Sequence, residues 1–231
     1  MQVLLTVDLE PDCPPYLHTF RGMETGAALL LQLLADEGVP ATFFTTGEVA
    51  RRFPAVLTRL VAAGHELGGH GDTHRDFTRL TVAEATAEIA VSSQSLRRFA
   101  PVTAFRAPYL KFPERYLPLL VAHGYQIDAS QAKYKLAYYR SSAPAPLKRI
   151  AASVTSSVLR LPDALRRPWL ARLASPVVLF VHPWEFVDLR NEQLRLDCRF
   201  NTGPPALAAL QTVIRWFKQQ GAGFCTISQG S

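Results

Sequence analysis

Short runs rich in Val, Phe, Ile and Thr alternate with longer stretches of helical apolar spacing along most of the chain. This alternation is typical of β and α units that wind around a mainly parallel sheet. The short runs predict strands at 3–7, 41–45, 66–68, 104–106, 125–128, 177–181 and 223–227. The longer stretches predict helices at 26–37, 54–63, 81–99, 114–123 and 204–220. The pattern therefore favours the α/β class.

Length and composition favour one domain. Of the 231 residues, 48% are hydrophobic and 19% are charged, so the core is large enough to need neither disulfides nor a structural metal. No linker or repeat divides the chain, and we expect a single domain over residues 1–231. Only the stretch 131–175 departs from the alternation, which predicts either an insertion or lid that contacts the substrate or a partly disordered surface loop.

Charge and targeting signals exclude several classes of partner. The net charge is +6, but the arginines occur as scattered pairs, which predicts a solvated basic surface and no nucleic-acid partner. The three cysteines contain no C-x-x-C pair, so no disulfide framework is expected. The chain shows no signal peptide and no apolar run of about 18 residues, so we expect a cytoplasmic protein without a transmembrane segment.

Polar side chains stand at the carboxyl ends of the predicted strands, one strand after another. They are Asp8 and Glu10, His70 and His74, Arg106, Asp128, and His182. In a parallel α/β barrel these strand ends meet at one mouth. Residues more than a hundred positions apart can therefore belong to one site.

The spacing of His70 and His74 lets two imidazoles bind one ion, although such a pair is a weak signal by itself. Asp8 and Glu10 strengthen it, because carboxylates at the end of a buried strand are costly unless they are paired or bind metal. Two histidines and one carboxylate leave positions open for water, as in catalytic zinc sites. We therefore expect one divalent metal ion, with zinc the commonest choice.

Hydrolysis at such a metal also needs a base and an acid. One carboxylate cannot easily be both a metal ligand and a free base. Asp8 and Glu10 supply one for each of these two roles, with Asp8 as the base and Glu10 as the ligand. His182 closes a very apolar strand and is the candidate acid. The structural alternative for His182 is a core histidine that is hydrogen bonded to the backbone.

Five motifs in this order resemble the polysaccharide deacetylase family, the NodB-homology domain of carbohydrate esterase family 4. They are Thr6-Val-Asp8-Leu-Glu10, His70-Gly-Asp-Thr-His74, Arg106-Ala-Pro-Tyr109, the segment around Asp128, and Leu179-Phe-Val-His182-Pro-Trp184. The resemblance covers about residues 3–228. It implies a distorted (β/α)7 TIM-like barrel and metal-dependent removal of an acyl group, most often acetate, from an N-acylated sugar.

The resemblance also implies roles for the matching residues. Asp8 resembles the catalytic base and Arg106 the arginine that holds it, while His182 resembles the general acid and Asp128 its partner. The resemblance implies that Leu179 and Trp184 line the acyl pocket. It also implies that the backbone N–H of Tyr109 donates to the oxyanion.

The metal ligands implied by the resemblance include one ambiguity. His70 and His74 match the family's histidine ligands. The first motif reads D-x-E, as in a divergent branch, instead of the commoner adjacent aspartates. The third ligand is therefore Glu10, with Asp12 as the competitor.

The expected function is a metal-dependent hydrolase that removes an acyl group, chiefly N-acetyl, from an amino sugar or glycan. The alternatives are a catalytically silent carbohydrate-binding barrel and an amidase for small cyclic amides. The H-P-W-E sequence at 182–185 also resembles the divergent branch, some members of which act on small amides or lipid-linked sugars. A lipid-linked substrate would add peripheral contact with a membrane.

Overall fold

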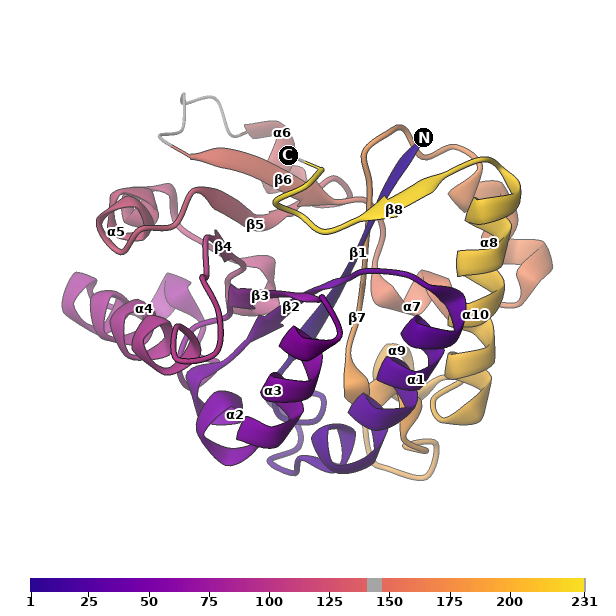
Figure 1. Ribbon diagram of the computed structural model, residues 1–231, viewed down its shortest axis with the longest axis horizontal. Coiled ribbons are helices and arrows are strands. Elements are labelled where there is room, and N and C mark those ends of the chain that lie inside the picture. Colours follow the sequence, from indigo (N-terminus) through magenta and orange to yellow (C-terminus); the bar gives the residue numbers. More distant parts are fainter. Residues whose placement is uncertain (141–146, 231) are drawn as a thin grey trace.

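The computed structural model describes residues 1–140 and 147–230. Within them, eight strands form one sheet around a central first strand (Figure 1). The strands are β1 (Gln2–Leu9), β2 (Thr42–Thr45), β3 (Glu66–Gly69), β4 (Ala104–Phe105), β5 (Ile127–Ala132), β6 (Lys148–Ala152), β7 (Val177–Val181) and β8 (Gly223–Cys225). Strand β7 has the predicted bounds, and the other six predicted strands are present with shifted ends.

The sheet is parallel and nearly closed. Its order is β6-β5-β4-β3-β2-β1-β7, and β8 pairs with the amino-terminal half of β1. The backbone N–H of Ser153, just after β6, donates to the carbonyl of Val178 in β7 at 2.8 Å. This bond joins the two ends of the sheet. The expected distorted (β/α)7 barrel is therefore confirmed.

Helices surround the barrel. They are α1 (Ala27–Glu37), α2 (Gly47–Arg52), α3 (Pro54–Ala62), α4 (Val82–Leu96), α5 (Leu117–Ala122), α6 (Leu136–Arg140), α7 (Ser156–Leu159), α8 (Asp163–Leu170), α9 (Leu196–Arg199) and α10 (Pro204–Gln219). Among them, α7 and α9 contribute residues to the cavity at the mouth of the barrel. A π-helical turn, Gly22–Gly26, leads into α1. In the described part of the chain, no helix combines the length and the apolar character needed to cross a membrane.

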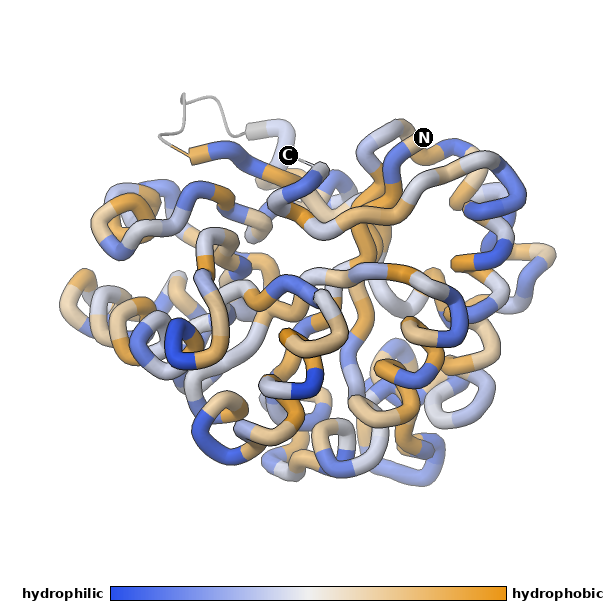
Figure 2. Tube along the Cα trace, in the orientation of Figure 1, coloured by the Kyte–Doolittle hydropathy of each residue, from blue (hydrophilic) through white to orange (hydrophobic). Residues whose placement is uncertain are grey.

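Strand β1 separates the outer core from the barrel interior. Val3, Leu5 and Val7 pack in the main apolar cluster with the helices, whereas Leu4 packs in a second cluster with residues of the other strands. Side chains of a strand alternate between its two faces. The polar residues Thr6 and Asp8 therefore share the inner face with Leu4. Figure 2 shows the hydrophobic residues concentrated along the central strands.

The expectation that the stretch 131–175 is an insertion between two strands was wrong in part. The stretch contains β6, a strand of the barrel itself, as well as α6, α7 and α8. Residues 141–146 of this stretch lie outside the described residues. Strand β6 begins with Lys148 and Arg149 and ends with alanines, a composition with weak β propensity.

A glycine before α1 sets how closely that region approaches the end of β7. A Cβ atom on Gly26 would lie 2.0 Å from the carbonyl oxygen of Pro183, whereas one on Gly223 would meet nothing within 4 Å. We expect Gly26→Ala to lower the free energy of unfolding by about 1–3 kcal/mol through overpacking. Gly223→Ala, the control, should change it by less than about 0.5 kcal/mol. Urea denaturation measures both, and equal stabilities would contradict the packing at Pro183.

Candidate active site

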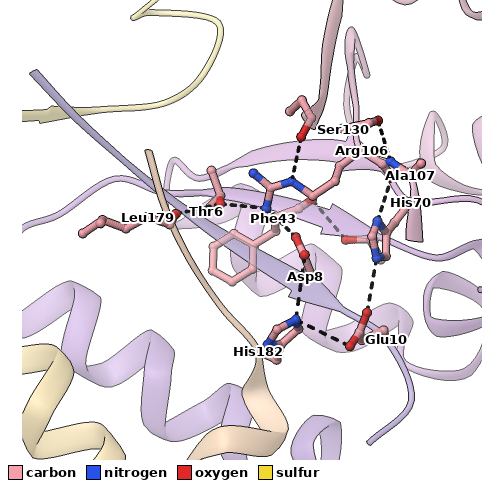
Figure 3. A network of polar contacts seen from close by, with 12 residues as sticks. Thr6, Asp8, Glu10, Phe43, His70, Arg106, Ala107, Ser130, Leu179 and His182 are labelled. Atoms are coloured by element: carbon pink, nitrogen blue, oxygen red, sulfur yellow. Dashed lines mark hydrogen bonds and ion pairs between the residues drawn. The ribbon is translucent and has the colours of Figure 1, made fainter. Parts of the chain in front are cut away.

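A buried ion pair joins β1 to the end of β4. Nη1 of Arg106 donates to Oδ1 of Asp8 at 2.7 Å and to Oγ1 of Thr6 at 2.8 Å. Arg106 is fully buried, and its guanidinium lies 4.2 Å from the ring centroid of Phe44. The barrel thus brings together residues 98 positions apart and holds the Asp8 carboxylate in one orientation (Figure 3).

Beside this pair, one carboxylate and two imidazoles face each other. Oε2 of Glu10 lies 3.2 Å from Nε2 of His70 and 2.6 Å from Nε2 of His74. The possible ligand atoms of the three residues lie within 4.8 Å of one another, and all three residues are buried. The structure therefore brings Glu10, His70 and His74 into one group, as the sequence predicted.

The hydrogen bonding of this group fits a divalent cation. Nδ1 of His70 lies 2.7 Å from the carbonyl oxygen of Arg106, so it carries the proton and Nε2 keeps its lone pair. In the described part of the chain, neither ring nitrogen of buried His74 has a hydrogen-bond partner. Burial raises the pKa of Glu10, but the imidazoles of His74 and His182 outweigh it and hold that pKa well below its ordinary value. Two imidazoles and one carboxylate form a suitable ligand set for zinc.

Asp12, the competing third ligand, has a different environment. Its carboxylate accepts hydrogen bonds from the backbone N–H groups of Arg21 and Gly22 at 2.7 and 2.8 Å and from Oγ1 of Thr19 at 2.7 Å. These bonds hold the loop that leads into the turn before α1. The structure places Glu10 against the histidines, and Asp12 in that loop.

His182 follows β7 and faces the same group from the opposite side. Its Nε2 lies 3.6 Å from Oε1 of Glu10 and 3.9 Å from Oδ2 of Asp8. Its Nδ1 lies 2.7 Å from Oε1 of Glu185, and its ring stacks on Trp184 at 4.8 Å. Burial lowers the pKa of His182, but the carboxylates, Glu10 and Glu185 foremost, outweigh it and raise that pKa to about 9. The alternative of a core histidine bonded to the backbone is thus not what is found.

The expected pairing of Asp128 with His182 is wrong. Asp128 accepts from the backbone N–H of Ser130 at 3.0 Å and from Nε of Arg149 at 3.1 Å, while Glu185 occupies Nδ1 of His182. Burial raises the pKa of Asp128 above its ordinary value. Strand β5 therefore directs Asp128 to its neighbour β6 instead of to the end of β7.

Sequence reasoning missed Glu185, although a local signal was present. Residues Pro183–Phe186 form a 3₁₀ turn with Pro183 at its first position and Glu185 at its third. Glu185 also accepts from the backbone N–H of His182 at 3.1 Å, as in a capping box. Behind it, Nε of buried Arg160 lies 2.9 Å from its Oε2. An H-P-x-E sequence can thus predict a histidine that is oriented by its own turn.

A cavity of about 250 Å³ opens over these groups. Tyr109 and Trp184 line it, and Nε1 of Trp184 donates to Glu10 at 3.2 Å. Tyr109 has a left-handed backbone, with φ 60°, and its ring lies edge-on to His74 at 4.8 Å. Leu179 does not line the cavity, and that expectation was wrong. Strand alternation turns Leu179 into the outer core and places Phe180 in the lining.

The two candidate carboxylate ligands can be separated experimentally. We expect Glu10→Gln and His74→Ala to lose stoichiometric zinc, because each removes one of the converging ligand atoms. Asp12→Asn should keep zinc and lose only stability, because its carboxylate bonds to the backbone. Elemental analysis of the purified variants gives the metal content, and full zinc in Glu10→Gln with loss in Asp12→Asn would reverse the assignment.

Comparison with known proteins agrees with this geometry. The sequence model of the polysaccharide deacetylase family, described as "Polysaccharide deacetylase", matches residues 2–127. A chitooligosaccharide deacetylase of Bradyrhizobium sp. is 37% identical over 83 residues, which are 35% of this chain and 38% of that protein. A peptidoglycan deacetylase of Helicobacter pylori is 31% identical over 110 residues, which are 46% of this chain and 37% of that protein. The chain thus spans less than two fifths of the length of either relative.

The fold is also found among solved structures. A family 4 carbohydrate esterase from Streptomyces lividans, in complex with acetate, superposes with a TM-score of 0.68 at 19% identity, covering 98% of this chain and 92% of that one. This likeness concerns the barrel. Because the family's sequence model matches more than half of the 231 residues, the chain belongs to the polysaccharide deacetylase family.

Proposed function

We propose that residues 1–231 form one catalytic domain that hydrolyses an acyl group, chiefly N-acetyl, from an amino sugar or glycan. The observation that carries the proposal is the arrangement around the cavity. A carboxylate held by Arg106 and an imidazole held by Glu185 face the same group of three ligand residues. A hydrolase needs a base, an acid and a means of polarising the carbonyl within reach of one reacting atom.

Glu10, His70 and His74 would hold the metal ion. A divalent cation bound there, most commonly zinc, would supply Lewis acidity that polarises the acyl carbonyl and acidifies water. His70 is oriented for this role by its bond to the carbonyl of Arg106.

Asp8 acts as the general base. Its Oδ1 is held by Arg106, so Oδ2 is the oxygen that accepts a proton from the attacking water. The water oxygen forms a bond to the acyl carbon, and the π electrons of the acyl C=O bond move onto the carbonyl oxygen.

His182 acts as the general acid. Nδ1 is bound to Glu185, which leaves Nε2 to donate its proton to the leaving nitrogen as the C–N bond breaks. The products are a carboxylic acid and an amine. We assign the backbone N–H of Tyr109 to the oxyanion and the ring of Trp184 to the acyl pocket, because both residues line the cavity beside these groups.

The substrate class rests on the family and its named relatives. Relatives named chitooligosaccharide deacetylase and peptidoglycan deacetylase support an N-acetylated amino sugar within a glycan as the substrate. The presence of both Asp8 and His182, each with its own buried partner, favours turnover over a silent binding barrel.

Removing the base and removing the acid should have different consequences. Asp8→Asn should lose about 10²- to 10⁴-fold in turnover on any acyl substrate, because water must be deprotonated in each case. His182→Ala should affect an acetamido sugar far more than an aryl acetate, whose phenolate leaves without a proton. Steady-state kinetics on chitooligosaccharides and 4-nitrophenyl acetate make the comparison, at equal metal content. Equal losses on both substrates in His182→Ala would show that His182 is not the acid.

The pH profile identifies the partner of the acid. His182 must be protonated to donate, so activity should fall as the pH rises through its pKa of about 9. Glu185 faces Nδ1, on the ring edge away from Glu10, and its negative charge raises that pKa. In Glu185→Gln the alkaline limb of kcat/KM should move to lower pH by roughly one unit or more. Asp128→Asn is the control and should leave the limb in place; a limb that moves only in the control would overturn the pairing.

A further inference from the structure

Three residues, Gly71, Asp72 and Thr73, connect the two histidines of the ligand group. The backbone is unusual at Gly71, the first residue of this connection, and at His74, which follows it. Gly71 has φ 74° and His74 has φ 59°, both in the left-handed region. For a residue with a side chain, such a conformation costs about 1–3 kcal/mol and persists only where the surroundings hold it. Other parts of the structure must therefore hold this connection in place.

The two histidines differ in how their rings are oriented. Nδ1 of His70 is bonded to the carbonyl of Arg106, which fixes that ring directly. Neither nitrogen of His74 has a hydrogen-bond partner in the described part of the chain, although its Nε2 lies 2.6 Å from Glu10. The position of the His74 ring thus depends on its backbone and on packing, including the edge contact with Tyr109.

The carboxylate of Glu88, a buried residue of α4, accepts hydrogen bonds from backbone N–H groups of the connection. Oε2 of Glu88 accepts from the backbone N–H groups of Asp72 and Thr73 at 2.7 and 2.9 Å. Its Oε1 accepts from Oγ1 of Thr73 at 2.5 Å. Glu88 is only 6% exposed, and a Cβ on Gly71 would lie 3.1 Å from its Oε2. The missing side chain at Gly71 therefore lets the carboxylate approach.

Helix α2 donates hydrogen bonds to backbone carbonyls of the same connection. The backbone N–H groups of Gly47 and Glu48 donate to the carbonyls of Gly71 and Asp72, each at 3.0 Å. Arg51 forms two bonds with the Asp72 carboxylate, at 2.7 and 3.1 Å. The connection is thus held between the first turn of α2 and Glu88, and Glu88 is the side chain that binds its amides.

We propose that Glu88 is a positioning residue for the metal centre, which acts by holding the 71–73 backbone so that His74 faces Glu10. The inference rests on the proposed metal site. It assigns a functional role to a helix residue that touches no ligand atom. Loss of such a supporting partner typically costs 10- to 100-fold in metal affinity, and we expect about that loss for Glu88→Ala.

The test measures zinc affinity by competition with a chromophoric chelator, on the full chain and without substrate. Glu88→Gln keeps one oxygen that can accept the two N–H bonds, so it should retain more affinity than Glu88→Ala. Ile89→Val is the matched control, because Ile89 is the next residue of α4, is fully buried and packs in the main core. It should cost about 0.5–1.5 kcal/mol of stability while leaving zinc affinity unchanged.

Hydrogen exchange of the zinc-free proteins supplies a second readout. The amides of Asp72 and Thr73 should exchange faster in Glu88→Ala than in the wild type or in Ile89→Val. Wild-type zinc affinity in both folded Glu88 variants would overturn the inference, as would equal loss in Ile89→Val. If the wild-type protein itself binds no zinc, the metal site fails and the inference fails with it, so the two failures are distinguishable.

Discussion

The buried guanidinium of Arg106 organises the centre of the barrel. A charge taken out of water is costly unless it is paired. Nη1 of Arg106 binds Asp8 and Thr6 and its Nε binds the carbonyl of Ala129, whereas its Nη2 has no hydrogen-bond partner among the described residues. The carbonyl of the same residue accepts from His70. A single residue thus orients both the Asp8 carboxylate and the His70 imidazole, and any shift of the short strand β4 would disturb both.

Charges alternate outward from that residue. Arg106 pairs with Asp8, His182 lies between Asp8 and Glu185, and Glu185 pairs with buried Arg160. Burial raises the pKa of Glu185, but Arg160 and His182 outweigh it and lower that pKa. Each charge in this series therefore has an opposite neighbour. Arg160 also donates to the carbonyls of Asp197 and Phe200, so the cavity wall at α9 is tied to the same series.

Much of this arrangement could be predicted locally. Strand β7 follows from an apolar run, and the placement of Asp8, His70 and His182 at one mouth follows from their positions at strand ends. The ends of parallel strands converge whatever the intervening helices contain. Glu10 comes directly after the first strand, and only three residues separate His70 from His74, so it also follows from the sequence that these three residues lie in one group.

The sequence by itself determined the fold class and which strand ends carry the polar residues of the candidate site, because periodicity and strand direction are local properties. Only the tertiary structure decided which side chains are partners. Glu185 rather than Asp128 meets His182, Phe180 rather than Leu179 faces the cavity, and Glu88 reaches the ligand loop from a separate helix. Partnership depends on the face a strand presents and on the reach of a side chain across the barrel. Those quantities are set when the elements pack, and the order of residues along the chain does not contain them.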